Sequence, residues 1–211
     1  MGVLIGRIFG TDIRATGGFF LLMGLYYFFF NQDLAATGIF CIALIVSLLI
    51  HEFGHVFAVR WQLGSESSIV LWGLGGVCLH EPTRDPKKRI IISLMGPAFQ
   101  AVPGIVFASI FLLAPPAEPH LRLFVVIMAL INVVWLLFNL IPILPLDGGH
   151  ALRAALEMKL GAAKADPLAR KVSVVCAAGV VALALYFSQP FIAMMGGLLL
   201  FQNLPGRRQS F

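Results

Sequence analysis

Long apolar runs separated by short polar or proline-containing connectors occupy most of this chain. Because about 20 apolar residues cross a bilayer as a helix, we expect spans over residues 13–30, 34–61, 90–113, 121–139, 168–187 and 190–204, the last being short. The pattern predicts an all-α polytopic membrane protein with about six transmembrane helices, organised as a single domain over residues 1–211.

Residues 69–80 differ from the apolar runs because they are too few for a span and combine glycines with β-branched residues. This composition favours a short β-hairpin bent at residues 73–76. Irregular backbone at membrane depth is tolerated only where it lines a cavity or is covered by protein. We therefore expect a membrane-embedded hairpin, with an ordinary interfacial loop as the alternative.

The composition agrees with a membrane protein, since 59% of the residues are hydrophobic and only 12% are charged. The net charge of +5 indicates basic cytoplasmic loops rather than nucleic-acid binding. With six spans and a cytoplasmic N-terminus, every lysine and arginine except Arg122 lies on the cytoplasmic side. Without an evident organellar targeting segment, we expect a bacterial or archaeal cytoplasmic membrane. The three cysteines indicate packing residues rather than a disulfide framework.

The most informative polar residues are His51, Glu52 and His55, inside the run over residues 34–61. Ionisable groups at membrane depth are costly and mark functional sites by default. Positions i and i+4 share one face of a helix, so both histidines can point at one ion. Glu52 lies about 100° around the helix from His51, beside that ion, where it can take a proton from water. A chance pair of helix-packing histidines is the alternative.

Two histidines leave zinc one protein ligand short of a usual catalytic site. Asp147 precedes the basic residue Arg153 by six positions, about 9 Å along a helix, which gives it a depth similar to that of the histidines. Asp147 is therefore the expected third ligand, although it can instead cap the following helix. His80 and His150 are alternative ligands, which we expect nearer to the interface.

Two motifs together resemble the site-2 protease family of intramembrane zinc metalloproteases. They are H-E-F-G-H at 51–55 and N-L-I-P-I-L-P-L-D-G at 139–148, the latter similar to the family's N-x-x-P-x-x-x-L-D-G. Gly96-Pro97 resembles its G-P-x-x-N motif, with Gln100 in place of the asparagine. The segment around Gly75-Gly76 resembles its membrane-embedded β-hairpin. The resemblance covers about residues 35–155, and it is to a compact form without a PDZ or CBS domain.

The resemblance implies one Zn²⁺ per chain and a role for each residue that matches the family motifs. A three-helix catalytic core within residues 35–155 would carry the site, with accessory helices at 13–30, 168–187 and 190–204. Glu52 would be the catalytic base, and Asn139 would contact the substrate backbone or stabilise the oxyanion. Gly75 and Gly76 would bind substrate. The metal ligands would be His51, His55 and Asp147.

The resemblance further implies a substrate that is a transmembrane segment of a single-span membrane protein. It would be cut near the cytoplasmic side of the lipid bilayer, in regulated intramembrane proteolysis, after an upstream site-1-type protease. A divalent-metal transporter or channel with the same ligands is the main alternative, and a non-enzymatic scaffold is a third. Transport can tolerate Glu52→Gln, whereas hydrolysis cannot, so Glu52 distinguishes these functions.

Overall fold

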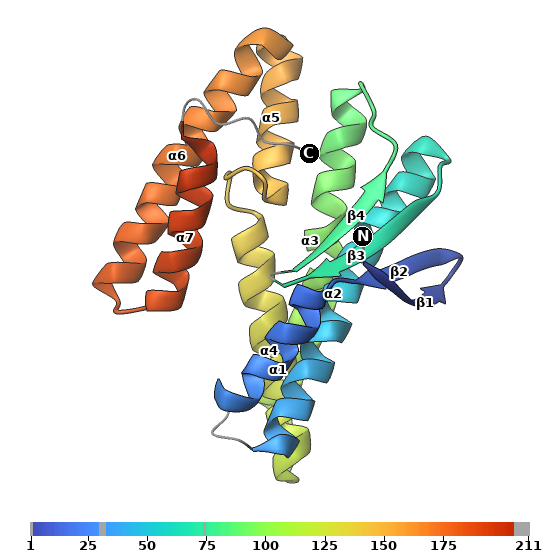
Figure 1. Cartoon of the computed structure of the whole chain (residues 1–211), viewed down its shortest axis with the longest axis vertical. Helices are drawn as coiled ribbons and strands as arrows, with labels where there is room; N and C mark the ends of the chain where they lie inside the picture. The colour runs from blue at the N-terminus through green and yellow to red at the C-terminus, as the bar shows by residue number, and fades with distance from the viewer. Residues whose placement is uncertain (1, 30–32, 74, 205–211) are drawn as a thin grey trace. The chain divides into compact units, whose positions relative to one another are not determined.

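The computed structural model describes residues 2–29, 33–73 and 75–204, and it is mostly helical with one small β-sheet (Figure 1). The strands are β1 (Val3–Ile8), β2 (Thr11–Ala15), β3 (Ser67–Trp72) and β4 (Gly75–His80). The helices are α1 (Gly17–Phe29), α2 (Leu34–Leu63), α3 (Pro86–Leu113), α4 (Pro119–Asn139), α5 (Asp147–Leu160), α6 (Ala162–Tyr186) and α7 (Pro190–Asn203).

The chain divides into two compact units. The first comprises Met1–Pro82 and Met95–Leu137, and the second comprises Thr83–Leu94 and Phe138–Phe211. The prediction of one protease domain over the whole chain stays a prediction.

Four of the described helices, α2, α3, α4 and α6, are long and apolar enough to cross a membrane. The shortest of them, α4, has 21 residues and is about 32 Å long, close to the thickness of a bilayer core. These helices support an integral membrane protein. The expected count of six spans is not confirmed, because α1 and α7 have only 13 and 14 residues. The predicted first span ends at residue 30, which lies outside the described residues.

The N-terminal part of the first unit corrects the sequence-based expectation. Residues 13–15 belong to strand β2, not to the start of a span, and the helix begins only at Gly17. Strands β1 and β2 pair antiparallel around Phe9 and Gly10, both with positive φ (50° and 76°). Such a two-residue turn matches the twist of a hairpin, and glycine adopts it without strain.

All four strands form one sheet in the order β1-β2-β3-β4 (Figure 1). β2 pairs with β3 in parallel, and β3 pairs with β4 antiparallel. Two strands therefore stand where a hairpin was expected, but they belong to a larger sheet. Their embedding in the membrane stays a prediction.

The core of the first unit lies between this sheet and its helices. Ile13 and Ala15 of β2 and Ile69 and Leu71 of β3 are almost fully buried and pack with apolar residues of α2 and α4. A hydrogen bond of 2.9 Å from Nη2 of Arg60 to Oγ1 of Thr11 joins α2 to β2. This packing orients α2, which carries the H-E-F-G-H motif.

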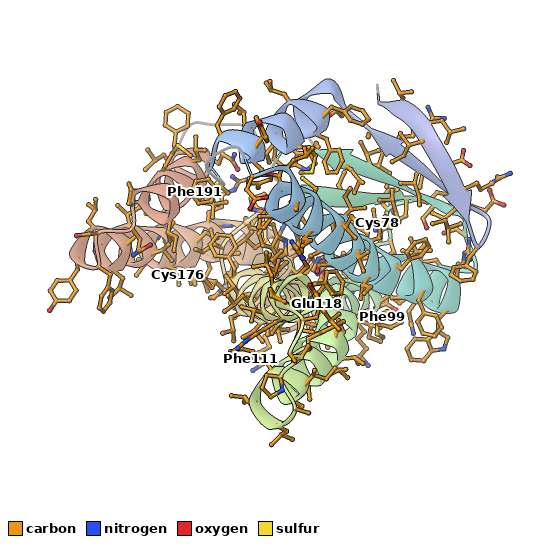
Figure 2. The ribbon with its side chains drawn as sticks, turned by 90° about the horizontal axis from the view of Figure 1, so that it is seen from below. Cys78, Phe99, Phe111, Glu118, Cys176 and Phe191 are labelled. Carbon is orange, nitrogen blue, oxygen red and sulfur yellow. The ribbon has the colours of Figure 1, made fainter. Side chains whose placement is uncertain are left out.

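The second unit holds α5, α6 and α7. Helix α6 packs against both α5 and α7, and Ile143, Ala177 and Leu199 form an apolar core in this unit. An ion pair between Arg89 and Glu157 joins the beginning of α3 to α5. Figure 2 labels Cys78 on the sheet and Cys176 on α6, and all three cysteines are free.

Candidate metal centre

His51 and His55 lie one turn apart on α2 and face each other. Their Nε2 atoms are 3.2 Å apart, and their ring planes are at 79°. The two side chains are only 5% and 8% exposed. Two imidazole nitrogens therefore converge on one point in a buried environment, as the i, i+4 spacing predicts.

Gln100 fixes the hydrogen bonding of this pair. Nδ1 of His51 lies 3.0 Å from Oε1 of Gln100, and because an amide oxygen only accepts, Nδ1 is the donor. In the neutral imidazole, the lone pair then resides on Nε2, the atom that faces His55. Gln100 itself is fully buried. The sequence offers one signal for this role, since Gln100 follows Gly96 by one helical turn on α3.

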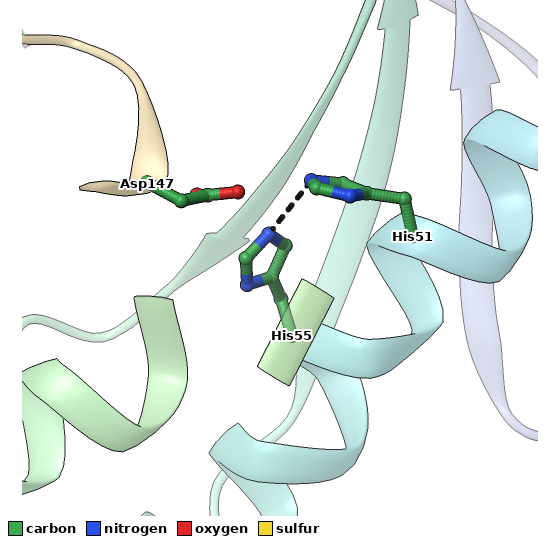
Figure 3. A group of neighbouring side chains, drawn as sticks. All are labelled: His51, His55 and Asp147. Atoms are coloured by element: carbon green, nitrogen blue, oxygen red, sulfur yellow. Dashed lines mark hydrogen bonds between the residues drawn. The ribbon is translucent and has the colours of Figure 1, made fainter. Parts of the chain in front are cut away.

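The arrangement fits a metal ion. Two nitrogens that bind one tetrahedral zinc at about 2.0–2.1 Å lie about 3.3–3.4 Å apart, close to the observed 3.2 Å. Figure 3 draws the two histidines, with a dashed line at this contact between their Nε2 atoms. Imidazole nitrogen and carboxylate oxygen are usual zinc ligands. Asp147 belongs to the second unit, and its assignment to the same ion is a proposal.

Asp147 is the first residue of α5, and Leu146 occupies the N-cap position before it. Gly148 and Gly149 follow and are both buried. The alternative in which Asp147 serves as the helix cap therefore does not describe this helix start. The carboxylate instead lies at the junction between a loop and α5.

Glycines lie within and beside the H-E-F-G-H motif of the first unit, at positions where a Cβ atom would collide with neighbouring atoms. A Cβ atom on Gly96 would collide with Nε2 of His55, and one on Gly54 would collide with the backbone of Met95. A Cβ atom on Gly76 would lie 2.6 Å from Cγ of Glu52. Strand β4 thus passes directly beside the predicted base, and α3 passes directly beside the histidines.

Glu52 is 3% exposed, and its charge affects the neighbouring thiol. Burial, and secondly the Glu52 carboxylate, raise the pKa of Cys78 to about 12. The thiol is therefore protonated at neutral pH, and the thiolate is the nucleophilic form.

The remaining predicted residues occupy varied positions. Asn139 is the last residue of α4 and lies in the second unit. Gly75 begins β4 and has open space beside it. Nδ1 of His80 donates to the backbone oxygen of Glu81 at 2.7 Å, and His150 lies in the first turn of α5. The functions predicted for these residues remain predictions.

Comparison with known proteins points to one family. The model of peptidase family M50 matches residues 39–119 and 114–187. A Methanocaldococcus jannaschii protein named zinc metalloprotease MJ0392 is 32% identical over 135 residues, covering 62% of this chain and 38% of the relative. A Synechocystis protein, sll0528, named as a candidate zinc metalloprotease, is 29% identical over 165 residues, covering 72% of this chain and 43% of the relative.

A solved structure shares the fold of this chain. The site-2 protease from Methanocaldococcus jannaschii matches with a TM-score of 0.68 and 22% identity, covering 100% of both chains. The chain spans less than half the length of the two curated relatives described above. Because the family model matches more than half of the sequence, including the H-E-F-G-H and L-D-G segments, this chain belongs to peptidase family M50.

Proposed function

We propose that this protein is an intramembrane zinc metalloprotease that hydrolyses a peptide bond in a transmembrane segment of another membrane protein. The observation that carries this proposal is the buried Nε2 pair of His51 and His55, 3.2 Å apart, with Glu52 on the same helix. Family membership and the names of the relatives support zinc as the metal and proteolysis as the activity.

In the proposed site, His51, His55 and Asp147 hold one zinc ion. The ion would supply Lewis-acid polarisation of the scissile carbonyl and would lower the pKa of water toward about 7. Glu52 takes the proton from the attacking water and later delivers it to the leaving amine. Asn139 contacts the substrate backbone or stabilises the developing oxyanion. The buried surroundings strengthen each of these electrostatic interactions.

A helical substrate hides its carbonyls in hydrogen bonds, so it must unwind before it can react. We propose that the unwound segment pairs as an extended strand with β4, the last strand of the sheet order. Two facts support this position. Gly76 of β4 lies directly beside Glu52, and the side chains of Val77 and Leu79, later in the same strand, are exposed by 40% and 51%.

The distribution of basic residues supports a cytoplasmic N-terminus. We further propose cleavage near the cytoplasmic side of a bacterial or archaeal membrane. The proposed substrate is a single-span protein that an upstream protease has already trimmed. A reporter tag inserted at residues 115–119 should be labelled from outside the cell, and labelling only from the cytoplasm contradicts this topology.

The activity is tested with detergent-purified protein and a transmembrane reporter substrate. Wild type and Glu52→Gln should each hold about one zinc per chain, while His55→Ala and Asp147→Ala should lose it. Cleavage should disappear in His55→Ala and Asp147→Ala because the zinc is lost. It should disappear in Glu52→Gln because general-base catalysis contributes about 10²- to 10⁴-fold. If Glu52→Gln still cleaves the reporter, the proposed mechanism is wrong.

The same variants test the alternative, a divalent-metal transporter. In liposomes, a transporter should carry zinc or manganese inward with wild-type protein and with Glu52→Gln alike. Metal flux that survives Glu52→Gln, together with no cleavage by wild type, would replace the protease proposal.

A further inference from the structure

The loop that leads into Asp147 is held by two side chains from other helices of the second unit. Leu144 is 1% exposed. Its backbone N–H donates to Oγ of Ser173 on α6 at 2.9 Å. Its backbone oxygen accepts from Nδ2 of Asn203 on α7 at 2.6 Å. Two helices thus satisfy both backbone groups of one loop residue.

Both holding side chains are themselves fixed. The Ser173 hydroxyl donates to the backbone oxygen of Ala169, one turn earlier on α6, at 2.9 Å. Nδ2 of Asn203 also donates to the backbone oxygen of Leu199 on α7 at 2.8 Å. Ser173 and Asn203 are 0% and 2% exposed. Each side chain is therefore tied to its own helix and to the loop, away from competing water.

The loop transmits this restraint to Asp147 through close backbone packing. The N–H of Leu146 donates to the oxygen of Ile143 at 2.8 Å. A Cβ atom on Gly149 would overlap the backbone of Ile143, and one on Gly148 would overlap that of Leu140. Leu144 lies three residues before Asp147, so a shift of Leu144 displaces the start of α5 and its first side chain.

We propose that Ser173 and Asn203 are positioning residues that hold the Asp147 carboxylate in place as a metal ligand. This inference rests on the proposed function, because it takes Asp147 as a zinc ligand. Groups that orient metal ligands typically contribute about 10- to 100-fold in metal affinity. Both side chains act through the backbone of Leu144, and neither contacts the ion or the substrate.

The test measures the zinc dissociation constant of the full chain in detergent by competition with a chelator. Ser173→Ala and Asn203→Ala should each weaken zinc binding about 10- to 100-fold. The matched controls are Val175→Ala and Gln202→Ala, which alter exposed residues on the same two helices and should bind zinc like wild type. Ser173→Ala removes one hydroxyl group, so it decides the question if Asn203→Ala does not fold.

A second set of variants separates positioning from general structural damage. In an Asp147→Ala background, the weak zinc affinity that remains comes from the two histidines. Ser173→Ala and Asn203→Ala should not lower it further, because the ligand that they position is already absent. A further loss of similar size in that background means that the two residues only support the fold, which overturns the proposal. Unchanged zinc affinity of the single variants Ser173→Ala and Asn203→Ala would also overturn the proposal.

Failure of the proposed function has a different signature. If Asp147→Ala binds zinc like wild type, Asp147 is not a ligand, and both proposals fall. If Asp147→Ala loses zinc while Ser173→Ala and Asn203→Ala keep it, only the positioning role is overturned.

Discussion

Oε1 of Gln100 on α3 lies 3.0 Å from Nδ1 of His51 on α2, and both side chains are buried. This hydrogen bond leaves the acceptor lone pair of His51 on Nε2, the atom that faces His55. The residue that departs from the asparagine of the family motif thus contacts one of the two predicted histidine ligands. It selects the tautomer in which His51 can bind a metal ion.

Replacing Gln100 should therefore weaken metal binding without touching a ligand. We expect Gln100→Met, which is similar in size but has no acceptor oxygen, to reduce zinc affinity about 10- to 100-fold. Chelator competition gives the affinity, and cobalt substitution reports ligand geometry through its visible spectrum. Wild-type affinity and an unchanged cobalt spectrum would show that the hydrogen bond is dispensable.

Gly96 should tolerate no side chain, since a Cβ atom there would collide with Nε2 of His55. We expect Gly96→Ala to lose most of its zinc in a metal assay of purified protein. Gly104→Ala is the matched control on the same helix, because its Cβ would lie 3.5 Å from Val133, an ordinary contact. It should keep its zinc and gain up to about 1 kcal/mol in stability. Full zinc content in Gly96→Ala contradicts this account of the site.

Gly76 and Gly75 form a pair that tests the position of β4 beside the base. We expect Gly76→Ala to lower the cleavage rate by at least about tenfold while zinc is retained, because its Cβ would displace Glu52 from its place in the proton transfer. Gly75→Ala has open space and should cleave normally. Equal cleavage rates for the two variants would show that the position of β4 beside Glu52 does not affect proton transfer.

Ser47 and Asn132 make a buried polar contact one turn from His51. Nδ2 of Asn132 donates to Oγ of Ser47 at 2.9 Å and to the backbone oxygen of Met128 at 2.7 Å. A double-mutant cycle with Ser47→Ala and Asn132→Ala, followed by unfolding in mixed micelles, should give a coupling of about 0.6 kcal/mol, at most about 1.7. A coupling indistinguishable from zero would show that this pair does not stabilise the packing of α2 against α4.

Glu118 precedes α4, and its carboxylate accepts from the backbone N–H groups of Leu121 and His120. These hydrogen bonds lower the pKa of Glu118 below its ordinary value. A lowered folded-state pKa stabilises the fold above the unfolded value of about 4.3, and this contribution is lost as pH falls through the folded value. A carbon-13 NMR titration should therefore give a pKa below about 4.3. A value at or above it would contradict the capping contact.

The edge of β4 can be tested with proline, which has no N–H to donate. Successive residues of a strand direct their N–H groups to opposite sides, so Val77→Pro and Cys78→Pro together sample both the edge and the contact with β3. We expect at least one of them to reduce cleavage while zinc content stays normal. Normal cleavage by both variants would exclude strand pairing at this edge.

Several features were predictable because they depend on residues that are close in sequence. The i, i+4 spacing of His51 and His55 placed both histidines on one face, and the apolar runs predicted the four longest helices. The alternation of Thr11, Ile13 and Ala15 with polar residues was a strand signal of the same local kind. The expected span over residues 13–30 overrode it, so β2 was missed.

The sequence by itself thus determined the helices, the histidine pair with its glutamate and the resemblance to a family of proteases. Only the tertiary structure decided the parallel pairing of β2 with β3 and the contact of Gln100 with His51. It also decided the hydrogen bonds between the backbone of Leu144 and the side chains of Ser173 and Asn203. The physical reason is that helix periodicity is a short-range property. A buried hydrogen bond, in contrast, depends on which distant segments pack together, and residues such as Leu144 and Asn203 lie 59 positions apart.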